Sequence, residues 1–154
     1  MSRTFPTIAI MIGLATGLLT LSGGDASARS EVWRHNGSEM VWTSIAGIRQ
    51  VIKYRDPRNA VHRNGVQNGS VLFRGWRIGR RLYGRARTWR AGCHKTFRYK
   101  VRGWVSPDGR RAVLQGARPV IRDCRIVALV PYGRDATLVL EKRRPRDDDD
   151  YYGL

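Results

Sequence analysis

RRLYGRARTWRAGCHKTFRYKVRGWV, residues Arg80–Val105, contains the clearest strand pattern of the sequence. Apolar or small residues alternate with charged or aromatic ones along Lys95–Val105, and a similar alternation runs along Arg80–Trp89. Successive side chains of an extended strand point to opposite faces, so this period of two indicates half-buried β-strands. The segment therefore predicts an antiparallel hairpin with one face toward a core.

The inward face of this hairpin carries small and apolar residues. These are Leu82, Gly84, Ala86, Thr88, Phe97, Tyr99, Val101, Gly103 and Val105. Glycine inside a strand often marks a bend or a close approach of another chain segment. Gly84 and Ala86 therefore predict close packing, as in the wall of a small barrel.

The outward face combines cations with aromatic rings. We predict polyanion binding by Arg81, Arg85, Arg87, Trp89, Arg98, Lys100, Arg102 and Trp104, with Tyr83 interleaved among them. Cations contact phosphate, sulfate or carboxylate groups, and exposed aromatic rings stack on bases or sugars. The alternative is a solvated face on which guanidinium groups lie against indole rings and only stabilise the strand locally.

The rest of the chain repeats short strand patterns between turn signals, such as Asn36-Gly37 and Ser106-Pro107-Asp108-Gly109. The other predicted strands are Val32–His35, Met40–Ser44, Ile48–Arg55, Val71–Ile78, Arg111–Ala117, Ile126–Val130 and Thr137–Leu140. A short helical turn is predicted near Ala60–Arg63. Regularly spaced short strands are typical of sandwiches and barrels. We predict an all-β domain over residues 29–140, a small antiparallel barrel or sandwich of about eight short strands.

The two ends of the chain differ in composition from this domain. An uncharged run from Ile8 to Leu21 precedes Ala26-Ser27-Ala28, a small-x-small pattern that predicts cleavage before Arg29. The run is too short for a membrane anchor. Residues 1–28 thus predict a helical, cleavable signal peptide and a protein that is periplasmic or secreted. Residues 141–154, with Asp147–Asp150, predict a charged and disordered tail.

The chain contains two cysteines, Cys93 and Cys124. An even number of cysteines in a small exported domain is typical of a disulfide. A structural zinc site needs a cluster of Cys and His ligands, and one Cys-His pair is not such a cluster. A catalytic thiol at Cys93 is disfavoured because the adjacent His94 points to the opposite face of an extended chain. We predict a Cys93–Cys124 disulfide, no metal site and no cofactor.

The net charge of the chain and its lack of catalytic motifs both limit the functions that the sequence allows. The formal net charge is +17, which favours polyanionic partners such as anionic polysaccharide, nucleic acid or lipid headgroups. An arginine-rich composition without a binding purpose is the alternative. No catalytic residue is predicted, because outside the charged tail the sequence has no close pair of carboxylates, and it has no nucleophile elbow or phosphate loop. The scattered histidines His35, His62 and His94 leave a secreted ribonuclease-like enzyme as an alternative.

Several blocks in a fixed order resemble a family of short, exported alphaproteobacterial β domains of unassigned function. A similar module occurs behind caspase-like peptidase domains. The blocks are Trp33-Arg34-His35-Asn36-Gly37-Ser38 with Met40, Tyr54-Arg55-Asp56-Pro57-Arg58, Gly65-Val66, Gly69-Ser70, Leu72-Phe73-Arg74-Gly75, Tyr83-Gly84-Arg85-Ala86, Ala91-Gly92-Cys93 and Cys124. The resemblance covers roughly residues 33–140 and implies a stand-alone module without the peptidase. It brings no catalytic residue.

The sequence therefore predicts a non-catalytic binding or structural module of the cell envelope. Its expected partner is an anionic polymer or another envelope component. An enzyme-inhibitor domain is a further alternative, although the positive charge argues against docking on a basic enzyme such as lysozyme. The sequence predicts no oligomeric state.

Overall fold

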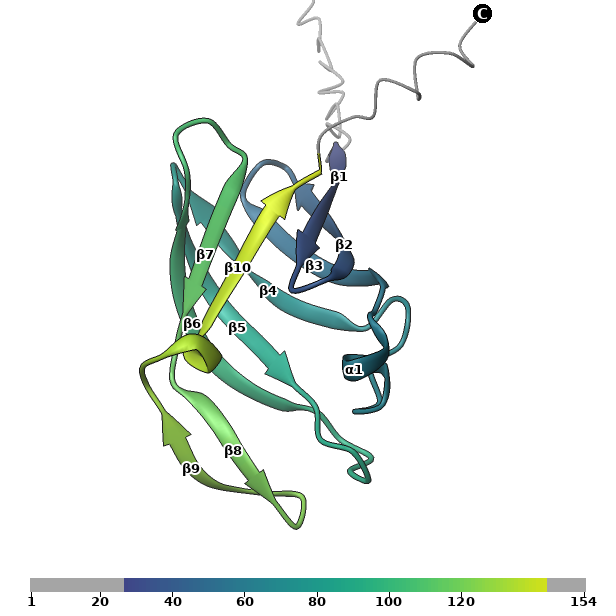
Figure 1. The fold of residues 1–154 in the computed structure, drawn as a ribbon. Helices are drawn as coiled ribbons and strands as arrows, with labels where there is room; N and C mark the ends of the chain where they lie inside the picture. The colour runs from purple at the N-terminus through teal and green to yellow at the C-terminus, as the bar shows by residue number, and fades with distance from the viewer. Residues whose placement is uncertain (1–26, 144–154) are drawn as a thin grey trace, which may run out of the picture.

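Ten β-strands, the short helix α1 and the 3-10 turn η1 make up the described part of the chain (Figure 1). The structure is a computed structural model and describes residues 27–143. The elements are β1 (Ala28–His35), β2 (Ser38–Ile45), β3 (Arg49–Asp56), α1 (Asn59–His62), β4 (Val71–Ile78), β5 (Arg81–Thr88), β6 (Phe97–Val105), β7 (Arg111–Gln115), β8 (Arg118–Arg122), β9 (Arg125–Val130), η1 (Arg134–Ala136) and β10 (Thr137–Lys142).

Eight of these strands close into an antiparallel barrel in the order β1-β10-β7-β6-β5-β4-β3-β2. From β1 to β7 each strand pairs with its neighbour in sequence. The chain then forms the separate β8–β9 hairpin before β10 returns to pair with both β7 and β1. The predicted all-β antiparallel fold is confirmed as a barrel. No helix within residues 27–143 is long and apolar enough to cross a membrane.

Each of the predicted strands has a counterpart in the structure, and α1 lies where a helical turn was expected. Strand β8 was not predicted. It contains Pro119, which removes a backbone donor and argues against a strand when read from sequence. Its turn into β9 places Asp123 and Cys124 at φ values of 49° and 55° without a glycine. This hairpin therefore lacks the Asn-Gly signal that marks the β1–β2 turn.

The barrel interior follows the alternation of the strands. The buried residues of β5 and β6 are Leu82, Ala86, Thr88, Phe97, Tyr99, Val101 and Val105, as predicted. Other strands contribute the remaining buried apolar side chains, including Trp33, Met40, Trp42, Ile52, Tyr54, Leu72, Phe73, Ala112, Leu114 and Leu140. This one-sided burial leaves the cations of β5 and β6 on the outer surface of the barrel.

Gly84 allows the barrel wall to pack closely, as predicted. It pairs with Gly75 on β4, and a Cβ added at Gly84 would collide with the Arg74 carbonyl oxygen. The same Cβ would lie 2.7 Å from the ring of Phe73, which covers the two glycines from inside the barrel. The absence of side chains at both positions therefore lets the Phe73 ring pack closely against the wall.

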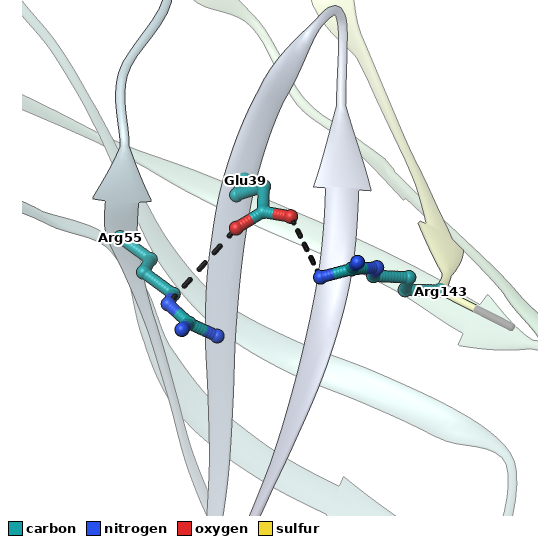
Figure 2. A network of polar contacts seen from close by, with 3 residues as sticks. All are labelled: Glu39, Arg55 and Arg143. Atoms are coloured by element: carbon teal, nitrogen blue, oxygen red, sulfur yellow. Dashed lines mark hydrogen bonds and ion pairs between the residues drawn. The ribbon is translucent and has the colours of Figure 1, made fainter. Parts of the chain in front are cut away.

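The barrel closes at a short seam between β1 and β10. Only Trp33↔Lys142 and Arg34↔Glu141 are in register there, and the Arg143 amide donates a further hydrogen bond to the Val32 carbonyl at 3.0 Å. Glu39 on β2 reinforces the seam by contacting Arg143 at 3.2 Å, while its other oxygen lies 4.0 Å from Arg55 on β3 (Figure 2). Lys142 contacts Glu31 at 2.8 Å.

These contacts extend the domain past Leu140. Glu141 and Lys142 are strand residues of β10, although the sequence analysis assigned them to the tail. The remainder of the predicted tail, residues 144–154, lies outside the described residues, as do residues 1–26 of the predicted signal segment. Ala28, which was assigned to that segment, is the first residue of β1 and pairs with Ile45.

The disulfide between Cys93 and Cys124 is present, with a Cα–Cα distance of 5.5 Å and a sequence separation of 31. Cys93 lies in the connection between β5 and β6, and Cys124 lies in the turn between β8 and β9. The bridge therefore ties the β8–β9 hairpin to the barrel at the end that also carries α1 (Figure 1). Such a bond is consistent with an oxidising compartment.

Candidate polyanion-binding face

The outer surface of β4, β5 and β6 forms one continuous face, which we call the cationic face. It carries seven cations: Arg74, Arg81, Arg85, Arg87, Arg98, Lys100 and Arg102. All are exposed except Arg87, which is half-buried. The register brings together all the cations that were predicted from the β5–β6 hairpin.

Like charges stand directly opposite each other across these strands. Arg87 pairs with Arg98, and Arg85 lies between Lys100 on one side and Arg74 on the other. Like charges at directly opposite positions destabilise an antiparallel pair. The sheet therefore carries an electrostatic cost that an anionic ligand would relieve.

The cations of this face have no acidic partners in the described chain. The four ion pairs within residues 27–143 use Arg55, Arg118, Lys142 and Arg143, none of which belongs to the face. Burial, followed by the charges of Arg98 and Arg74, lowers the pKa of Arg87. A guanidinium group nevertheless keeps its charge in proteins, so the crowding of positive charge persists at neutral pH.

Exposed aromatic rings lie among the cations. Trp76 on β4 stands opposite Tyr83 on β5, and Tyr83 in turn stands opposite Arg102 on β6. Trp104 stands opposite Arg81. Trp76, Tyr83 and Trp104 are 56%, 44% and 48% exposed, so each ring presents much of its area to solvent. Rings exposed in this way are available for stacking on flat groups of a ligand.

The β4 contribution was missed in the sequence analysis. Arg74, Trp76 and Ile78 are exposed on the same face as the hairpin residues. Their alternation is visible in the sequence, and β4 was predicted as a strand. What the sequence alone did not show is that β4 pairs with β5 in a register that continues the face, with Trp76 beside Tyr83.

Trp89 does not share the cationic face, and its predicted outward position was wrong. Strand β5 ends at Thr88, so the alternation that governs Arg81 to Arg87 stops before Trp89. Its ring packs against the core and meets the ring of Tyr54 edge-on, with centroids 5.9 Å apart. Trp89 lines a cavity at the end of the barrel instead.

No family model, curated protein or solved structure matches this chain. The resemblance to exported β domains of unassigned function therefore stays a prediction.

The three histidines lie in different parts of the structure. His35 ends β1 and its Nδ1 donates a hydrogen bond to the Val139 carbonyl at 2.8 Å. Burial lowers the pKa of His35, which favours its neutral form at pH 7. His62 is exposed in α1, and His94 is exposed in the connection between β5 and β6. The ribonuclease-like alternative therefore stays a prediction.

Proposed function

We propose that this chain is an exported, non-catalytic module that binds an anionic polymer on the cationic face. The observation that carries the proposal is the set of like-charge pairs, which are interleaved with exposed aromatic rings and have no acidic partner within residues 27–143. Export is supported by the Cys93–Cys124 disulfide and by the predicted signal segment. The periplasm and the exterior are both compatible with these features.

A linear polymer suits the shape of the face. Arg98, Lys100 and Arg102 follow one strand at alternate positions, a span of about 13 Å for an extended chain. Further cations on β4 and β5 widen the face to three strands. A chain of phosphate, sulfate or carboxylate groups can contact several of these cations at once and release its condensed counterions. Sugar rings or bases of the same polymer can stack on Trp76, Tyr83 and Trp104.

The stacking part of the proposal is tested by single substitutions. Trp76→Ala and Trp104→Ala should each weaken binding of single-stranded DNA or heparin by roughly 1–3 kcal/mol, because each removes one stacking surface. The salt dependence of binding should change little, since no cation is lost. Both rings are exposed, so the variants should fold normally. Fluorescence anisotropy with labelled ligands gives the affinities, and the tighter ligand identifies the class of polymer.

Trp89→Leu is the matched control. It removes an indole of the same size from a position outside the cationic face and keeps an apolar side chain against the core. Its affinity for either polymer should equal that of the unmodified protein. Equal losses in all three tryptophan variants, or no loss at Trp76 and Trp104, would contradict stacking on this face.

A further inference from the structure

A cavity of about 790 Å³ opens at one end of the barrel. The same end carries α1 and the β8–β9 hairpin (Figure 1). Its lining residues come from the barrel strands, from α1 and from β8. This volume lies within the range that small-molecule sites occupy, and an eight-stranded barrel is wide enough to hold one small ligand. The cavity is distinct in position and shape from the cationic face, although Arg87 borders both.

The inner part of the cavity is apolar and aromatic. Tyr54 and Tyr99 line it and are only 5% and 8% exposed. The ring of Trp89 stands edge-on to Tyr54, and Val66 and Leu72 complete a buried apolar wall. Such a lining favours the burial of an apolar chain or ring over that of a strongly hydrated group.

Positive charge converges on the same aromatic residues. Arg58 comes from the connection between β3 and α1, Arg118 comes from β8, and both line the cavity. Asp135 contacts Arg118 at 3.4 Å, whereas Arg58 is in none of the ion pairs of residues 27–143. The cavity therefore offers a net positive end next to its apolar part.

The two phenols can serve as hydrogen-bond donors. Burial and the nearby Tyr99 raise the pKa of Tyr54 to about 12, although the charges of Arg58 and Arg118 oppose the shift. Burial likewise raises the pKa of Tyr99. Both hydroxyl groups are thus protonated at neutral pH, and a protonated phenol can donate to an anionic oxygen.

We propose that this cavity binds a small amphipathic anion, a single carboxylate or phosphate head on an apolar body. Arg58 and Arg118 hold the head, and the apolar body lies against Tyr54, Tyr99 and Trp89. A neutral lipid would leave the charge of Arg58 unused, and a cationic amphiphile would be repelled. The proposal is independent of polymer binding on the cationic face.

The experiment uses four probes that share one alkyl chain: decanoate, decyl phosphate, decanol and decyltrimethylammonium. Each is titrated into the disulfide-bonded protein below its micelle concentration and followed by calorimetry. At least one of the two anions should bind with one-to-one stoichiometry and about tenfold or more tighter than decanol, because hydrogen bonds to charged groups exceed 1.4 kcal/mol. The preferred anion distinguishes a carboxylate from a phosphate head. The cationic probe should show no saturable binding.

Two sets of substitutions assign the binding to the cavity. Arg58→Gln with Arg118→Gln should weaken binding of the preferred anion about tenfold or more and leave decanol binding unchanged, because only the head loses its partners. The triple variant Arg98→Ser, Lys100→Ser and Arg102→Ser should bind the anion as the unmodified protein does. The proposal is overturned if the anions bind no tighter than decanol, if none of the probes binds, or if the triple variant loses as much anion affinity as the cavity variant.

Discussion

A chain that ends at Leu140 should lose a large part of its stability, whereas a chain that ends at Arg143 should keep it. The shorter chain lacks the strand residues that pair β10 with β1, and it lacks the Lys142–Glu31 and Arg143–Glu39 ion pairs. Several backbone hydrogen bonds at about 1 kcal/mol each, with surface ion pairs worth about 0.2–1 kcal/mol each, give a loss of roughly 3–5 kcal/mol. A typical domain has only about 5–15 kcal/mol in total.

Urea unfolding of the two chains measures this loss directly. The chain ending at Arg143 is the matched control, because it retains the contacts of Glu141–Arg143 and differs from the shorter chain by those three residues alone. Its free energy of unfolding should match that of the full chain after removal of the first 28 residues. If the chain ending at Leu140 were as stable as this control, the seam between β1 and β10 would not hold the barrel closed.

Replacing Cys93 and Cys124 together by Ser should lower the free energy of unfolding by roughly 3–4 kcal/mol. The bridge closes a loop with a sequence separation of 31, and the chain-entropy model assigns about this stabilisation to a loop of that length. The melting temperature should fall by roughly 10 °C or more for a domain of this size.

Unfolding of the Ser variant should begin at the β8–β9 hairpin. This two-stranded sheet has few partners in the barrel other than the bridge, and an isolated hairpin is only marginally stable. Hydrogen exchange should therefore show faster opening of Arg118–Val130 than of the barrel strands in the Ser variant. An unchanged melting temperature, or two reactive thiols in the native exported protein, would argue that the bridge does not stabilise the molecule.

The sequence predicts those parts of the fold that depend on local pattern. Alternation along β5 and β6 identifies the buried and exposed faces, and Asn36-Gly37 identifies the first hairpin, whose two residues have φ values of 49° and 81°. Both features arise within a few residues of the chain. A period of two and a glycine at a positive φ are therefore readable without knowledge of distant contacts.

The wrong predictions concern residues whose positions depend on contacts with distant parts of the chain. The prediction that Trp89 faces outward extrapolated a strand beyond its last residue, and packing against Tyr54 decided its position instead. The role of Glu141 and Lys142 in closing the barrel depends on β1, more than a hundred residues earlier. A charged stretch near a chain end resembles a solvated tail when its distant partner strand is unknown.

The cations of the face on β5 and β6 were predictable from the sequence, whereas the extension of the face onto β4 was not. The identity of its cations follows from alternation, but the like-charge pairs depend on register across three strands. The cavity was not predictable, because Arg58 and Arg118 reach it from segments that are distant in sequence and meet only in the folded barrel.

Polymer binding is expected to depend on the cationic face and not on net charge alone. Affinity for single-stranded DNA is measured against salt concentration for two triple variants. The first variant removes three cations of the face through Arg98→Ser, Lys100→Ser and Arg102→Ser. The second variant removes three exposed arginines elsewhere through Arg63→Ser, Arg122→Ser and Arg125→Ser. Arg122 and Arg125 form a like-charge pair between β8 and β9, and the second variant changes the net charge by the same amount as the first.

The first triple variant should reduce the slope of log affinity against log salt by roughly 2, because each lost phosphate contact accounts for about 0.7. Its affinity should fall, while the second triple variant should keep the slope and affinity of the unmodified protein. Equal losses of slope and affinity in the two triple variants would contradict binding on the cationic face and leave only the overall positive charge as its cause.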